Sequence, residues 1–237
     1  MKRLLFIAAV FLFTASTASA QFAGSTTNEQ QGVKTTPGSN VQVQKKATWG
    51  LRLGLNVASL TGMDATLYNN TSPKIGFNVG IMTDIRLHKF VGMQTGLYYS
   101  WQGVKGEGRY TNRDTYSETV NLHYFRIPVL FGFRYDFKTR VHTQLQINTG
   151  PYLAIGFLGK WKDKSGSKES EGDIFDADSG GYDFSRFDAG WDVSAGFVVK
   201  KFYLGISYDF GFVNMAKKTW GAPVRNSVFA FSIGCNF

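Results

Sequence analysis

Residues 228–237, VFAFSIGCNF, end the chain with a strict alternation of two kinds of side chain. Val228 opens a set that continues with alanine, serine, glycine and asparagine, whereas Phe229 opens a set that is large and apolar except for one cysteine. Successive side chains of a β-strand point to opposite faces of the sheet. The stretch therefore predicts a strand with one face in an apolar environment and the other on a small, polar one.

Seven earlier stretches repeat this alternation, at residues 49–57, 75–87, 91–101, 124–135, 145–157, 187–197 and 202–211. Within them the charged residues fall with the glycines and not with the large apolar side chains; they are Arg52, Asp84, Arg86, Arg126, Arg134, Asp188, Asp192 and Asp209. A soluble barrel would point its apolar set inward and its charges outward. The opposite arrangement predicts an all-β fold: an eight-stranded antiparallel up-and-down transmembrane β-barrel of the outer-membrane type.

The segments between these stretches alternate in length. Long segments lie at 58–73, 103–119, 158–185 and 215–225, and short ones at 88–89, 137–141 and 200–201. Outer-membrane barrels have short periplasmic turns and long outer loops. We therefore expect both chain ends of the barrel on the periplasmic side.

The N-terminus predicts export. Lys2 and Arg3 precede an apolar run at 4–13, and Ala18-Ser19-Ala20 has the small residues of a signal-peptidase site. The run is shorter than the roughly 20 residues of a membrane-spanning helix. We expect a cleaved signal peptide at 1–20, a flexible periplasmic tail at 21–48 and the barrel at 49–237, with the mature protein in the cell outer membrane.

Composition argues against several functions. The net charge of +9 is scattered and forms no basic tract, so nucleic-acid binding is not expected. Cys235 is the chain's one cysteine, which excludes an intrachain disulfide and a cysteine-based metal cluster. The three histidines, His88, His123 and His142, have no serine at a spacing that indicates a catalytic partner, so no enzyme activity and no cofactor are expected.

One acidic stretch raises the question of a metal. Asp173, Asp176, Asp178 and Asp183 lie in a segment rich in glycine, and oxygen ligands suit calcium. Their spacing is not that of an EF-hand loop, and four lysines precede them. A solvated loop of mixed charge is the preferred interpretation, and no metal site is predicted.

The inward charges should form a polar plug, because an eight-stranded barrel is only wide enough for its own side chains. We expect Arg52, Asp84, Arg86 and Arg134 toward the periplasmic half, and Arg126, Asp188, Asp192 and Asp209 toward the outer half. A two-residue turn at 200–201 would place Asp192 directly opposite Asp209. Opposed like charges are unfavourable, so either Arg126 reaches both carboxylates or one of them is protonated.

Three segments carry a family resemblance: 121–131 (NLHYFRIPVLF), 150–152 (GPY) and 202–211 (FYLGISYDFG). They resemble strand motifs of the PorT-type, or porin-family, outer-membrane β-barrel proteins typical of Bacteroidetes, and the resemblance extends over 49–237. It implies a barrel fold and, for some members, a link to protein secretion. Phe237 is similar to the terminal aromatic residue that the barrel-assembly machinery reads in such proteins.

Two functions remain open on the sequence. The first is a non-enzymatic barrel with a plugged lumen that acts as a membrane anchor or a partner-binding or assembly component, with protein secretion as one role implied by the resemblance. Its partners would be outer-membrane lipid, the barrel-assembly machinery, and a protein bound through the outer loops or the periplasmic tail. The alternative is a small channel or ligand-uptake barrel, which requires a continuous water-filled lumen.

Overall fold

The computed structural model describes residues 47–62, 70–109, 115–165, 168–176, 184–216 and 223–237. The predicted signal peptide and nearly all of the predicted tail lie outside these residues. Within them are nine strands: β1 (Ala47–Thr61), β2 (Asn70–Arg86), β3 (Val91–Arg109), β4 (Thr115–Phe137), β5 (Thr143–Ser165), β6 (Lys168–Asp173), β7 (Phe187–Val199), β8 (Phe202–Gly211) and β9 (Arg225–Asn236).

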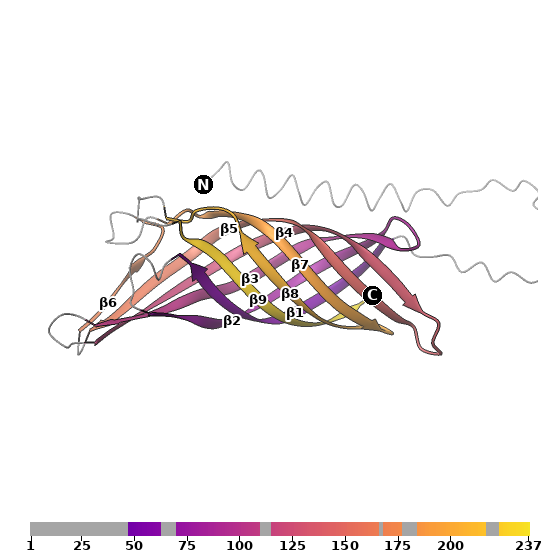
Figure 1. Cartoon of the computed structure of the whole chain (residues 1–237), viewed down its shortest axis with the longest axis horizontal. Helices are drawn as coiled ribbons and strands as arrows, with labels where there is room; N and C mark the ends of the chain where they lie inside the picture. Colours follow the sequence, from indigo (N-terminus) through magenta and orange to yellow (C-terminus); the bar gives the residue numbers. More distant parts are fainter. Residues whose placement is uncertain (1–46, 63–69, 110–114, 166–167, 177–183, 217–222) are drawn as a thin grey trace, which may run out of the picture. The chain divides into compact units, whose positions relative to one another are not determined.

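Eight of these nine strands close into a ring. β1 pairs with β2 and β9, and antiparallel pairing continues through β3, β4, β5, β7 and β8 until the ring is complete. β6 pairs with β5 alone and lies beyond one end of the ring, while the short turns lie at the other end (Figure 1). The predicted eight-stranded antiparallel up-and-down barrel is confirmed.

The two faces of the wall follow the predicted parity. In β1, for example, Leu53 is 50% exposed whereas its neighbour Arg52 is 2% exposed. The outward face of each of the eight wall strands carries large apolar side chains, mostly leucine, isoleucine, valine and phenylalanine.

In the part of the chain that the structure describes, no helix is long and apolar enough to cross a bilayer.

The wall continues farther outward than the sequence predicts. The segment expected as a loop at 103–119 is mostly strand, because β3 ends at Arg109 and β4 begins at Thr115. Likewise β5 continues to Ser165 and turns into β6, within the expected loop at 158–185. β1 begins at Ala47, inside the segment predicted as tail. The apolar alternation stops where the outward face leaves the hydrocarbon, but the backbone pairing does not stop there.

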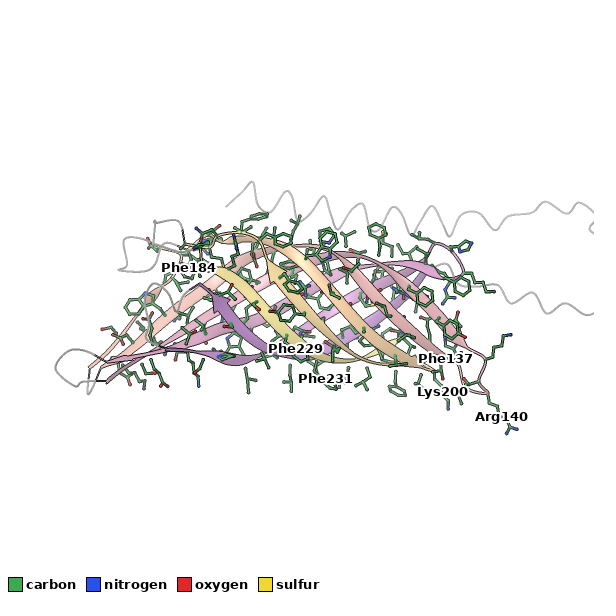
Figure 2. The ribbon with its side chains drawn as sticks, viewed as in Figure 1. Phe137, Arg140, Phe184, Lys200, Phe229 and Phe231 are labelled. Carbon is green, nitrogen blue, oxygen red and sulfur yellow. The ribbon has the colours of Figure 1, made fainter. Side chains whose placement is uncertain are left out.

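Figure 2 orients the barrel through individual side chains. Arg140 and Lys200 lie at the short-turn end, and Phe184 lies toward the opposite end, where β6 is found (Figure 2). Lys200 has a φ of 56°, a left-handed conformation that suits the two-residue turn between β7 and β8. We call the short-turn end periplasmic and the β6 end outer, following the rule for outer-membrane barrels.

The outward apolar face makes a stability prediction. Leu53→Arg places a cation in the middle of this face and should lower the free energy of unfolding by about 2–4 kcal/mol. Leu87→Arg, one residue past the periplasmic end of β2, should lower the free energy of unfolding by only about 0–1 kcal/mol, because the charge reaches the interface. Urea titration of the barrel in phosphatidylcholine vesicles measures both. Equal losses for the two variants would contradict this placement of the membrane.

Candidate functional site

The candidate site is the barrel interior, where the inward side chains of the wall strands meet. Arg126 on β4 lies in the outer half of this interior. One nitrogen of its guanidinium group contacts both Asp192 on β7 and Asp209 on β8. The distance from Nη2 to the Asp209 carboxylate is 2.6 Å. Asp192 and Asp209 are direct cross-strand partners, which is the predicted register. Arg126 bridges them, the first of the two arrangements that the sequence left open.

Asp188 lies near this triad but has different partners. The Tyr152 hydroxyl and the Asn226 amide each donate a hydrogen bond of 3.2 Å to its Oδ2. Neutral donors thus stabilise this buried carboxylate, and Arg126 stacks over the ring of the same Tyr152 at 4.6 Å. The four residues predicted for the outer half are therefore linked through Arg126 and Tyr152: Arg126 contacts Asp192 and Asp209, and Tyr152 contacts both Arg126 and Asp188.

A second ion pair occupies the periplasmic half. The guanidinium of Arg134 binds Asp84 with two nitrogens, Nε at 3.0 Å and Nη2 at 3.2 Å. The Gln146 amide donates to the same carboxylate at 3.0 Å. Because a bidentate arginine–carboxylate pair fixes both side chains, this group ties β2, β4 and β5 together across the lumen.

Arg86 and Arg52 do not join that pair. Arg86 binds Asp136 at 2.6 Å, and Gln144 also donates to Asp136. The sequence analysis did not single out Asp136, although it shares the inward parity of Arg134 two residues earlier. Arg52 has no ion pair within the described residues and instead stacks over the Tyr203 ring at 4.0 Å. The eight predicted residues thus form separate groups at different depths.

Glycines on the wall make room for these tyrosines. A Cβ atom at Gly205 would lie 2.2 Å from the Tyr203 hydroxyl, and one at Gly190 would lie 2.7 Å from that of Tyr152. Each tyrosine therefore lies over bare backbone and turns its ring face toward an arginine. Gly205 lies two residues after Tyr203 on β8, so the sequence already places both on one face, whereas only the register of β5 and β7 places Gly190 beside Tyr152.

The outer end of the lumen is apolar, which corrects the expectation of a polar interior throughout. Inward residues of the wall meet residues from the connections after β6 and β8 in one buried cluster, which includes Leu60, Val104, Leu122, Ala154, Ile174, Phe175, Phe184, Met215 and Val224. A backbone hydrogen bond from Ser185 to Met215 joins the two connections, and one from Phe184 to Ile174 lies within the first of them. This apolar layer lies above the ionic groups, at the outer end of the barrel interior.

Beyond the mouth the wall continues as a sheet made of the outer parts of β2 to β5 together with β6. Lys162 pairs with Glu171 at 3.1 Å and Lys164 with Glu169 at 2.5 Å, across the β5–β6 hairpin. The hydrogen bonds from these lysines lower the pKa of both glutamates below the usual value. The hairpin is thus charged but internally neutralised.

His123 and Asp173, two further candidates among the described residues, make local contacts. His123 points outward, where its Nδ1 lies 2.8 Å from the Tyr99 hydroxyl and its ring stacks on Trp101. Asp173 accepts a hydrogen bond from the Phe175 backbone and lies 3.7 Å from Arg186, while Asp178 and Asp183 lie outside the described residues. Across the described ranges, no three histidine, cysteine or acidic side chains are grouped so as to hold a metal ion.

A closed antiparallel barrel of eight strands, apolar outside and packed with ion pairs and tyrosines inside, is an outer-membrane β-barrel. The family model for an outer membrane protein beta-barrel domain matches residues 21–217 of this chain. The chain belongs to that family.

Several solved structures are similar. Ail, the attachment invasion locus protein of Yersinia pestis, is 13% identical with a TM-score of 0.37, covering 81% of this chain and 97% of its own. Neisserial surface protein A is 14% identical with a TM-score of 0.39, covering 81% and 98%. OprG from Pseudomonas aeruginosa is 11% identical with a TM-score of 0.44, covering 81% and 97%. A comparison with curated proteins finds no match.

The Arg126 triad makes a testable prediction. Arg126→Met leaves Asp192 and Asp209 facing each other without a cation, and should lower the free energy of unfolding by about 3–5 kcal/mol. Adding Asp192→Asn and Asp209→Asn should restore most of the loss, because the group is then neutral. Urea unfolding in vesicles at neutral pH compares the variants. A triple variant no more stable than Arg126→Met would show that the loss comes from packing and not from charge.

Proposed function

We propose that this protein is a non-enzymatic, non-conducting outer-membrane barrel that anchors an outer sheet in the membrane and presents it to a protein partner. The observation that carries the proposal is the apolar layer above the ionic groups. Ions and polar solutes need a continuous hydrated path, and this layer places buried apolar side chains such as Leu122 and Ile174, both 0% exposed, across the outer end of the interior.

The ionic groups beneath this layer strengthen the argument against conduction. Arg126 spans from β4 to carboxylates on β7 and β8, and Arg134 spans from β4 to β2. Each crossing fills the narrow interior of an eight-stranded barrel with a paired side chain. A solute would have to break a desolvated ion pair and then displace the apolar layer.

The outer sheet supports a binding role. β6 pairs on one side with β5 and, among the described residues, with no strand on its other side. Its charges, like those of β5, discourage indiscriminate pairing of that edge. A partner with a complementary pattern of charges could recognise the hairpin, whereas the apolar wall below it is suited only to lipid.

The absence of enzyme activity is part of the proposal. His123 is held by Tyr99 and Trp101 on the outward face, and His88 and His142 belong to the periplasmic turns. We further propose that the protein is exported through a cleaved signal peptide and that the barrel-assembly machinery recognises Phe237. A role in protein secretion like that of some PorT-type proteins is a third proposal. These proposals rest on the N-terminal pattern and on the resemblance of three short motifs.

Conductance in a planar bilayer tests the closed lumen. The folded full-length chain should give no steady current, and Arg126→Ala should give none either, because the apolar layer still closes the mouth. A diffusion porin inserted in the same bilayer is the positive control. Steady, ion-selective openings of the unaltered protein would overturn the proposal in favour of a small channel or ligand-uptake barrel.

Site-specific crosslinking tests the partner role. A photoreactive side chain at Glu169, on the outer hairpin, should yield a defined protein adduct in intact cells. The same side chain at Lys201, in a periplasmic turn, is the matched control and should not yield that adduct. Reversing the charges with Lys162→Glu and Lys164→Glu should abolish the adduct if the hairpin is the contact. An adduct at Lys201 and none at Glu169 would contradict the proposal.

A further inference from the structure

A group of lysines lies on the outward face of the wall, just beyond the apolar belt at its outer end. Lys74 on β2 is 8% exposed, and its ammonium donates a hydrogen bond to the amide oxygen of Asn121 on β4. The same ammonium lies 4.4 Å from the centre of the Trp101 ring. Lys74 thus crosses the neighbouring strand β3 to reach β4.

The backbone permits this crossing at one position. Gly103 on β3 is the cross-strand partner of Asn121, and a Cβ atom there would lie 3.3 Å from the Lys74 side chain and 2.0 Å from the Val120 carbonyl oxygen. β2 also has a bulge between Pro73 and Phe77, which redirects Lys74 toward this opening. The lysine is therefore held in place and does not extend freely into solvent.

Two more lysines adjoin it. Lys105 on β3 is the direct cross-strand partner of Ser72, two residues before Lys74 on β2, and its charge repels that of Lys74. Lys160 on β5 is the direct cross-strand partner of Asn121. Within the described residues none of these three lysines has an ion pair, whereas Lys162 and Lys164, farther out on the same face, are paired with glutamates.

The aromatic belt directly beneath fixes the depth of this lysine group. Trp101 stacks on His123 with ring centroids 6.0 Å apart and 7° between the ring planes. Phe125 stacks on Phe157 at 4.6 Å on the adjoining strands. Tryptophan side chains are enriched at the membrane–water interface, so Trp101 marks that level. Lys74, Lys105 and Lys160 therefore lie at the level of the lipid headgroups in the outer leaflet.

We propose that Lys74, Lys105, Lys160 and Asn121 bind a phosphate group of an outer-leaflet glycolipid. An ammonium group has three donors. Lys74 directs one to Asn121 and lies against the Trp101 face, so a donor remains for a phosphate oxygen. Lys74 and Lys105, which form no ion pair among the described residues, complement a phosphate ester, and Lys160, whose cross-strand neighbour on β6 is Asp173, adds a third cation at the edge of the group. The apolar belt below receives the acyl chains of the lipid. A lipid satisfies both features at once, which a soluble anion does not.

Lipid binding to the folded full-length chain in nonionic detergent tests this site, with native mass spectrometry as the readout. The probes are bisphosphorylated lipid A, the same lipid after chemical dephosphorylation, and inorganic phosphate. The unaltered protein should bind the phosphorylated lipid more tightly than either other probe. Equal binding of the dephosphorylated lipid, or binding of inorganic phosphate as tight as that of lipid A, would overturn the proposal.

Variants locate the site. Lys74→Gln combined with Lys105→Gln should weaken phosphorylated-lipid binding about 25-fold, since a basic residue at a membrane surface contributes about 1 kcal/mol, a factor of about five. Lys160→Gln, at an exposed position, should weaken it about fivefold and gives a second test if the buried substitution impairs folding. Lys89→Gln with Lys201→Gln removes the same charge at the periplasmic end and should leave binding unchanged. Equal losses in this control would overturn the proposal.

Discussion

Closure of the backbone hydrogen-bond ring is the constraint on which the rest of the structure depends. Hydrocarbon offers no partner for an unpaired N–H or C=O group, so a sheet in the membrane must have no open edge. β1 and β9 are the first and last strands of the wall, and their pairing joins the two edges of the sheet, while β4 and β5 continue the wall between them. Where the wall leaves the lipid, water can satisfy the backbone, and there β6 pairs on one side with β5.

Closure with eight strands leaves a narrow interior, and this narrowness explains how it is filled. Charges that turn inward cannot remain hydrated, so each needs a partner of fitting shape. Arg126 shares one nitrogen between two carboxylates, Arg134 forms a bidentate pair, and Arg52 uses an aromatic face. The glycines beneath Tyr152 and Tyr203 supply the space that such large side chains need. The plug is thus built from the wall itself.

The outer end combines three environments within a short distance. Inside, residues such as Phe175 and Phe184 form an apolar layer; outside, Trp101 and His123 end the lipid belt; just beyond them, Lys74 crosses over Gly103. The two faces of one wall thus carry different side chains at the same end of the barrel: apolar residues inside and lysines outside.

The sequence by itself determined the fold class, the number of strands in the barrel wall, the facing of the side chains and the opposition of Asp192 and Asp209. It could do so because a period of two and a two-residue turn are local properties that fix parity and register along a hairpin. Only the tertiary structure decided that Arg126 reaches both aspartates, that Arg52 stacks on the Tyr203 ring and that Asp136 forms an ion pair with Arg86. These contacts join strands that are distant in the chain, so no local pattern predicts them.

The outer extensions and the apolar layer also came from the tertiary structure. Beyond the lipid both faces of a strand meet water or mixed surroundings, so the alternation that marks a membrane strand disappears while the pairing persists. Ile174, Phe175 and Phe184 lie in a segment without periodicity, and their burial depends on the closed ring that places them over the lumen. The alternation along one strand shows which environment each of its faces meets. The packing of side chains inside the barrel depends on how eight strands are brought together, and no single strand determines it.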